Sequence, residues 1–137
     1  PFPGTRNSMA PGKARTTGMV PTIVYRDGKP VIIVGAPGGS VIISAVLQTI
    51  LNIVDFGMSP VEAVTVPRIH CEGAAVHAEA RVQGSVCRDL ESLGHTVNQS
   101  VLSFDPVMSR GHVITIRDGK WQGSADPRGG GGVAYAR

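Results

Sequence analysis

The hydrophobic and polar positions along the chain first predict a β-hairpin. Residues 22–25 and 31–34 are rich in Val, Ile and other strand-forming residues, and they flank the pair Asp27-Gly28. An Asp-Gly pair between two such runs is a strong signal for a tight turn. Both runs are almost continuously apolar, so we expect their sheet to be covered on both faces.

A long apolar segment at 40–56 predicts a helix rather than a strand, because of its length. Its polar residues recur every three or four positions, at Ser40, Ser44, Gln48, Asn52 and Asp55. This spacing places them in one narrow stripe of a helix about 25 Å long. The other faces are apolar, so we expect the helix to be mostly buried. Ser40 is expected to cap its start and Gly57 its end.

The rest of the pattern predicts shorter elements. They are a capped helix from Ser59 to about Val64, a half-buried strand at 76–82, a short helix at 87–93 and a second Asp-Gly hairpin between 112–116 and 120–122. This mixed order predicts an α+β layer structure. Residues 1–20 show no periodicity and are expected to form an extended loop or arm, with residues 21–137 as the folded part.

Composition narrows the class of protein. The chain has 137 residues, which suits one domain, and its 4% aromatic content implies an aliphatic core. The net charge is +3 and the basic residues are scattered, which argues against a nucleic-acid binder. No apolar run reaches the roughly 20 residues of a membrane span. The chain begins with Pro1 rather than Met, so we expect it to be a piece of a longer protein.

The two cysteines, Cys71 and Cys87, are too few for a disulfide scaffold. Two buried thiols are favoured over one disulfide, and both alternatives remain open. His70, Cys71, Glu72 and His77 invite a metal site, but three of them are adjacent in sequence and do not converge easily on one ion. We therefore predict no metal site, with His70 held by a hydrogen bond.

The strongest chemical signal is the glycine-rich segment 35–40, between a predicted strand and the predicted long helix. Such a turn leaves backbone N–H groups free at the positive end of the helix dipole, where negative charge is stabilised. That charge is either a bound anion or an oxyanion formed during a reaction. The segment lacks a phosphate-loop lysine and the spacing of a dinucleotide motif. The plain alternative is an ordinary turn with a helix cap.

Many short motifs in this chain follow one order that resembles the gamma-glutamyltranspeptidase family. They are Pro11-Gly12-Lys13, Met19, Pro21-Thr22-Ile23-Val24, Asp27-Gly28-Lys29-Pro30, Gly35-Ala36-Pro37-Gly38-Gly39-Ser40, Asp55-Phe56-Gly57-Met58, Glu62-Ala63, Pro67-Arg68-Ile69-His70 and Ser124-Ala125-Asp126-Pro127-Arg128. Each motif alone is weak, but together they run over nearly the whole chain. The chain looks like the C-terminal portion of that family's small subunit.

The resemblance implies part of an αββα four-layer sandwich of the N-terminal-nucleophile hydrolase type. A precursor of this kind cleaves itself, and a new N-terminal Thr attacks an amide, with no cofactor. The resemblance assigns the oxyanion hole to the N–H groups of Gly38 and Gly39. It implies that the partner is the rest of the precursor, and it favours a periplasmic or secreted location.

The resemblance also places Thr17, Gly18 and Met19 in the acyl pocket. Family members carry a Ser-Ser pair before this Met, whereas this chain has Thr17-Gly18, so strict gamma-glutamyl specificity is in question. The alternative for these residues is plain loop chemistry. For the protein, the alternatives are a related acylase that takes another acyl group and a non-catalytic module that binds an anion or a peptide.

The nucleophile that the resemblance requires is absent from this chain, because Pro1 has no hydroxyl and no Thr stands at the N-terminus. We predict that the purified 137-residue chain does not hydrolyse a gamma-glutamyl anilide. Release of the aniline, followed by absorbance, measures this directly. Clear turnover by the chain alone would contradict the prediction.

Overall fold

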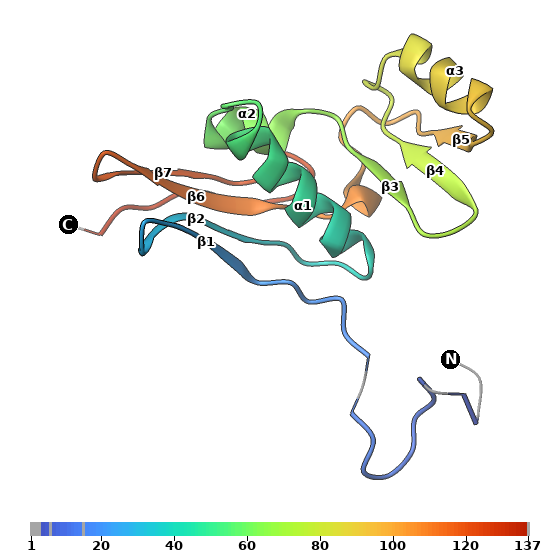
Figure 1. Cartoon of the computed structure of the whole chain (residues 1–137), viewed down its shortest axis with the longest axis horizontal. Coiled ribbons are helices and arrows are strands. Elements are labelled where there is room, and N and C mark those ends of the chain that lie inside the picture. Colours follow the sequence, from blue (N-terminus) through green and yellow to red (C-terminus); the bar gives the residue numbers. More distant parts are fainter. Residues whose placement is uncertain (1–3, 6, 15, 137) are drawn as a thin grey trace.

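The computed structural model describes residues 4–5, 7–14 and 16–136 of the chain. In this part of the chain, seven strands form two separate sheets (Figure 1). The larger is antiparallel, in the order β1 (Thr22–Arg26), β2 (Lys29–Gly35), β6 (His112–Arg117), β7 (Lys120–Ser124). The smaller has the order β3 (Ile69–Cys71), β4 (Ala75–Ala78), β5 (Thr96–Gln99), with β4 and β5 parallel.

Four helical segments accompany the sheets. They are α1 (Val41–Val54), α2 (Pro60–Thr65), α3 (Gly84–Ser92) and the short 3-10 helix η1 (Pro106–Met108). α1 packs over β2, and α2 packs over β6 and β7, on one side of the larger sheet (Figure 1). α3 packs against β5. The mixed α+β architecture predicted from the sequence is confirmed.

Both predicted hairpins are present. In the first, Asp27 and Gly28 have φ angles of 51° and 73°, and in the second, Asp118 and Gly119 have 51° and 72°. Two consecutive residues with positive φ are typical of the type I′ turn, whose twist suits the flanking strands. The Asp-Gly signal therefore identified both turns correctly.

The helix predicted at 40–56 is confirmed as α1, and its polar stripe has a structural purpose. The Gln48 side-chain amide donates to the carbonyl of Ile69 at 2.7 Å and accepts from the N–H of Ile69 at 3.1 Å. The Ser44 hydroxyl lies 2.9 Å from Nδ1 of His70. Asn52 donates to the carbonyl of Ala63 in α2. These three residues of the polar stripe therefore attach α1 to β3 and α2 instead of facing water, while Asp55 at the end of the stripe is exposed.

The expectation that α1 is mostly buried is wrong for the described chain. One apolar stripe is exposed by about half, at Ile43, Leu47, Leu51 and Val54 (52%, 53%, 39% and 48%). Because the polar residues face the rest of the fold, part of the apolar surface has to face outward. Another apolar face does enter the main core, which consists of Ile32, Val34, Ile42, Val46, Ile53, Ala63, Val64 and Val113.

The larger sheet is covered by helices on one face only. On its other face, Ile23, Tyr25 and Trp121 are each more than half exposed. The glycine-rich tail crosses part of this face, where Val133 packs so closely on Gly123 that a Cβ there would lie 3.0 Å from Val133 Cγ1. The predicted cover on both faces is thus incomplete among the described residues.

The middle of the chain differs most from the sequence-based expectation. The strand predicted at 76–82 is β4, and it stops at Ala78 because Glu79 turns into the protein interior. In a regular strand, Glu79 would share the polar face with His77 and Arg81, whereas its side chain is completely buried. β3, β5 and η1 have only three or four residues each, too short for a periodic signal. The capped helix from Ser59 and the helix ending before Gly94 are confirmed as α2 and α3.

Glu79 belongs to a buried network of charges. Arg128 binds both of its carboxylate oxygens, at 2.6 and 2.5 Å, and also binds Asp126 at 3.1 Å. Asp126 in turn binds Arg68 at 2.6 Å. Arg128 also donates to the carbonyls of Val64 and Val66, at 2.7 and 2.8 Å. The network therefore connects α2, the end of β4 and the segment after β7.

Burial and neighbouring charge act against each other in this network. Burial lowers the pKa of Arg68 most, and the positive charge of Arg128 lowers it further. The negative charge of Asp126 raises it but does not compensate, so the pKa of Arg68 lies below its ordinary value. For Arg128, burial also lowers the pKa, but the hydrogen bonds and charges of Glu79 and Asp126 outweigh it, so the pKa is raised. Arginine stays charged in either case. The network is thus two cations and two anions held out of water.

The N-terminal segment begins away from the sheets and joins them near its end. Its described residues up to Val20 form turns and extended chain with no helix or strand, and the earlier ones extend away from the folded part (Figure 1). Gly18 contacts the Gly39 backbone, and Val20 packs against the core. Among the described residues, no helix combines the length and the apolar character that crossing a membrane requires.

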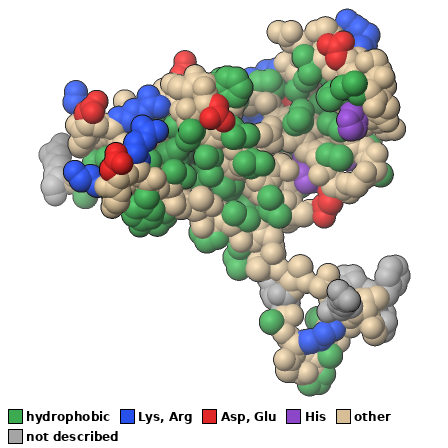
Figure 2. Space-filling view, viewed as in Figure 1, with side chains coloured by type: hydrophobic (Ala, Val, Ile, Leu, Met, Phe, Trp, Pro, Cys, Tyr) green, Lys and Arg blue, Asp and Glu red, His purple; other side chains and the backbone are tan. Residues whose placement is uncertain are grey.

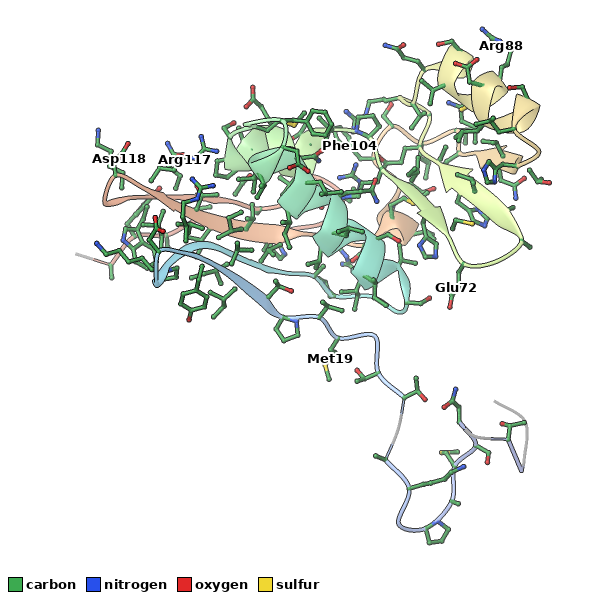
Figure 3. The ribbon with its side chains drawn as sticks, in the orientation of Figure 1. Met19, Glu72, Arg88, Phe104, Arg117 and Asp118 are labelled. Carbon is green, nitrogen blue, oxygen red and sulfur yellow. The ribbon has the colours of Figure 1, made fainter. Side chains whose placement is uncertain are left out.

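We expect Arg128→Met to lower the free energy of unfolding by about 3–5 kcal/mol, because it leaves Glu79 buried without its main counter-charge. Urea denaturation of the wild-type and variant proteins measures this loss. Arg88→Met in α3 is the matched control, since Arg88 is exposed (Figure 3) and should change stability by less than about 0.5 kcal/mol. Equal stability of the two variants would show that the network does not support the fold.

Candidate functional site

The predicted oxyanion turn lies between the end of β2 and the start of α1. Gly38 has a φ angle of 150°, which residues with a side chain rarely adopt. A Cβ on Gly38 would also lie 3.3 Å from both Ile42 Cγ1 and Ser109 Oγ. Gly39 differs, because a Cβ there would meet no atom within 4 Å. The fold of the described residues therefore requires glycine at 38 but gives no steric reason for glycine at 39.

The backbone donors of this turn are available. Among the residues that the structure describes, no group accepts a hydrogen bond from the N–H of Gly38 or Gly39, and both glycines are exposed. The first helical bonds begin one step later, from Ile42 N–H to the Gly39 carbonyl at 3.2 Å. Free donors at the positive end of a 14-residue helix favour negative charge.

Ser40 does not cap α1 in the way expected. Its backbone is already helical (φ −61°, ψ −26°), and its side chain makes no capping bond. Instead, the Ser40 hydroxyl donates to Oε2 of Glu72 in the turn after β3. The same Glu72 oxygen lies 3.7 Å from Nε2 of His70. Contacts from the smaller sheet therefore hold the start of α1, and Figure 3 shows Glu72 at the end of that sheet.

Ser109 supports the turn from the other side and was not identified from the sequence. It is buried, and its hydroxyl donates to the Pro37 carbonyl at 2.6 Å. Its backbone lies at φ 66° and ψ 175°, a region populated almost only by glycine, which costs about 1–3 kcal/mol. Its own carbonyl accepts a bond from Arg68 at 3.2 Å. No local pattern could reveal this residue, because its partner is 72 positions away in sequence.

The structure brings the predicted acyl-pocket residues next to the predicted oxyanion residues. A Cβ on Gly18 would lie 2.9 Å from the Gly39 carbonyl oxygen, so the two backbones are in direct contact. Thr17 accepts a hydrogen bond from the N–H of Met19 at 3.1 Å, and the Met19 side chain is exposed. Gly18 therefore has no space for a side chain unless the arm moves away from the turn.

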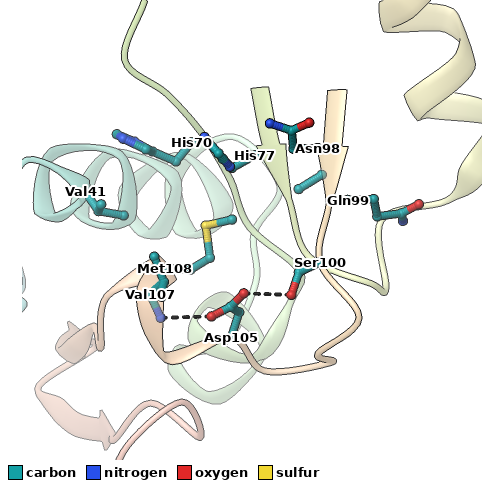
Figure 4. A pocket seen from close by; sticks show the side chains of 10 residues that line it. Val41, His70, His77, Asn98, Gln99, Ser100, Asp105, Val107 and Met108 are labelled. Carbon is teal, nitrogen blue, oxygen red and sulfur yellow. Dashed lines mark hydrogen bonds between the residues drawn. The ribbon is translucent and has the colours of Figure 1, made fainter. Parts of the chain in front are cut away.

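A pocket of about 360 Å³ lies between the smaller sheet and η1 (Figure 4). His70 and His77, which are paired across β3 and β4, both line it. The carboxylate of Asp105 on its wall is already used, because it accepts bonds from Ser100 Oγ and the Val107 N–H. Within the described ranges, no three His, Cys, Asp or Glu side chains are placed to hold a metal ion.

The cysteines and His70 agree with the sequence-based predictions except at Cys71. Both thiols are free, and Cys87 is buried as predicted. Cys71 is exposed, so the prediction of two buried thiols is wrong for this residue. It lies at the end of β3 beside Glu72, where the chain turns outward before β4. The predicted hydrogen bond of His70 is confirmed by its contact with Ser44.

Comparison with known proteins identifies relatives along the whole chain. Residues 2–136 match the model of the Gamma-glutamyltranspeptidase family. The Glutathione hydrolase proenzyme of Bacillus subtilis is 38% identical over 126 residues, which cover 91% of this chain and 21% of that protein. The Acylase ACY 1 proenzyme of a Pseudomonas species is 38% identical over 73% of this chain and 18% of its own length.

Solved structures agree with these sequence matches. A mutant of the Helicobacter pylori gamma-glutamyltranspeptidase superposes with a TM-score of 0.82 and 33% identity, over 92% of this chain and 69% of the other. The chain spans about a fifth of the length of the curated relatives it matches. The resemblance inferred from the ordered motifs is confirmed, and the chain belongs to the gamma-glutamyltranspeptidase family.

Proposed function

We propose that this chain is the C-terminal part of an amidohydrolase or acyltransferase that cleaves gamma-glutamyl amides such as glutathione. In this proposal, a Thr at a newly formed N-terminus, supplied by another part of the precursor, attacks the amide carbonyl. The acyl group then passes to water or to an amine. Relatives named glutathione hydrolase proenzymes support this choice of substrate. No cofactor takes part in the proposed reaction.

The open turn at Gly38 and Gly39 is the observation that carries the proposal. The negative charge of a tetrahedral intermediate exists only briefly, and fixed donors stabilise it most when they need no rearrangement. Gly38 is fixed by its own backbone conformation and by Ser109, while the surface at Gly39 is open to an approaching group. Glycine at 39 is then explained by access of the substrate rather than by folding.

Exposed apolar surfaces support the rest of the precursor as partner. The open face of the larger sheet carries Ile23, Tyr25 and Trp121, and α1 carries its exposed stripe. Figure 2 shows hydrophobic side chains gathered over the middle of the molecule, where Figure 1 places α1 and the strands beneath it. In the proposed αββα sandwich, this chain supplies one helical layer and one sheet, and a second sheet covers the open face.

A related acylase with another acyl group is the second candidate. The contact of Gly18 with Gly39 favours it, because a second hydroxyl for a gamma-glutamyl carboxylate has no space at position 18. The match to an acylase proenzyme points in the same direction. In the proposed site, Thr17, Gly18 and Met19 still line the acyl pocket, and Thr17 supplies the side-chain hydroxyl of this segment.

The first experiment is mass measurement and N-terminal sequencing of every polypeptide in the purified sample. A polypeptide that begins with Thr, either a longer form of this chain or a companion, is the expected result. A panel of gamma-glutamyl and other acyl amides then separates the two candidate substrates. A sample that contains only this chain would contradict the presence of the nucleophile and would instead indicate a fragment or a non-catalytic binding module.

Two glycine variants of the complete processed enzyme test the oxyanion turn. We expect Gly39→Ala to keep wild-type thermal stability, since its methyl group enters open space, but to lower kcat/KM about a hundredfold by displacing the substrate. Gly38→Ala should lower both activity and stability, the latter by about 1–3 kcal/mol from backbone strain.

Gly130→Ala is the matched control for these variants. A Cβ at Gly130 also meets no atom within 4 Å, and the residue lies in the glycine-rich tail. We expect Gly130→Ala to change neither kcat/KM nor thermal stability. Full activity of Gly39→Ala would refute a catalytic turn, because the added methyl group would then not meet the substrate.

A further inference from the structure

We infer that Ser109 is a positioning residue for the oxyanion turn. Its hydroxyl fixes the peptide group between Pro37 and Gly38, and thereby the direction of the Gly38 N–H. This inference rests on the proposed function, because it assigns Ser109 a role in that same reaction. The Gly38 N–H donor then depends on a residue from a distant part of the chain.

The geometry of one peptide group provides the mechanism. The Ser109 hydroxyl donates to the Pro37 carbonyl at 2.6 Å. The carbonyl and the following N–H belong to one rigid plane and point in opposite directions in a trans peptide. Holding the Pro37 carbonyl on the protein side therefore directs the Gly38 N–H to the opposite side. As described above, that N–H has no acceptor among the described residues.

The same hydrogen bond also makes Gly38 a better donor. A peptide group whose carbonyl accepts a hydrogen bond is polarised, and its N–H then donates more strongly. Ser109 is buried, with 3% of its surface exposed, so water competes little for its hydroxyl. An oxyanion at Gly38 would thus be stabilised by a donor that is both oriented and polarised before the reaction begins.

The strained backbone of Ser109 indicates that its hydroxyl is needed at this position. At φ 66° and ψ 175° a glycine would be free of strain, yet the chain carries serine. The strained conformation is held on its carbonyl side by Arg68, which Asp126 fixes at 2.6 Å. The hydroxyl is also close to Gly38 itself, since a Cβ there would lie 3.3 Å from Ser109 Oγ. The buried network therefore reaches the turn through Ser109.

Two substitutions separate the hydroxyl from the backbone strain. Ser109→Ala removes the hydroxyl and keeps the strain, whereas Ser109→Gly removes both. In the complete processed enzyme, with a gamma-glutamyl anilide as substrate, we expect each variant to lower kcat about tenfold and to leave KM within about twofold. Ser109→Gly should be at least as stable to heat as Ser109→Ala. Ser85→Ala, at an exposed serine in α3, is the control and should match the wild type.

A purely structural role predicts a different pattern. Activity would then follow thermal stability, and Ser109→Gly would keep the wild-type kcat because it relieves the strain. That result, or an unchanged kcat in Ser109→Ala, would overturn the inference. The split between kcat and KM matters because an oxyanion donor acts in the transition state and not in substrate binding.

Amide hydrogen exchange at Ile42 and Ile43 gives a readout that needs no activity, because their N–H groups bond to the Gly39 and Ser40 carbonyls and report whether the turn is held in place. We expect faster exchange in both Ser109 variants and unchanged exchange in Ser85→Ala. If the complete wild-type enzyme catalyses no acyl transfer, the proposed function is refuted. The hydrogen-exchange measurement would still decide whether Ser109 fixes the turn. Unchanged exchange in both Ser109 variants would refute the positioning role, even in an active enzyme.

Discussion

The fold depends on the buried charges of Glu79, Arg128, Asp126 and Arg68. These four side chains come from three distant parts of the chain, and each charge has a direct partner. Apolar packing gives the larger sheet its core, but packing is not directional. The charge network fixes how the two sheets and α2 are joined, and through Arg68 it also reaches Ser109 and the glycine turn. The same buried charges therefore stabilise the fold and hold the candidate oxyanion turn.

Local signals in the sequence were sufficient where an element is determined by its neighbours. The Asp-Gly turns, the proline and serine at the start of α2 and the length of α1 each depend on residues a few positions apart. The fate of Glu79 could not be predicted in this way, because its burial depends on Arg128, 49 positions later. The same holds for the short strand β3, whose stability comes from pairing with β4 and from α1.

In the candidate site, too, nearby residues could be identified from the sequence and distant partners could not. The order of short motifs was enough to indicate the turn at Gly38 and Gly39 and the segment at 17–19, and the structure places these segments in contact. The sequence did not show which residues hold the turn in place. Ser109 stands in no motif, and Glu72 was considered only for a metal site. Only the folded chain brings them to Pro37 and Ser40.

The attachment of Gln48 to Ile69 has a consequence for solubility. β3 is the outermost strand of the smaller sheet, and an outermost strand offers unpaired N–H and carbonyl groups that can recruit a strand from another molecule. The Gln48 amide occupies both groups of Ile69, as a neighbouring strand would. α1 therefore blocks the Ile69 end of this edge, so that a strand from another molecule cannot pair there.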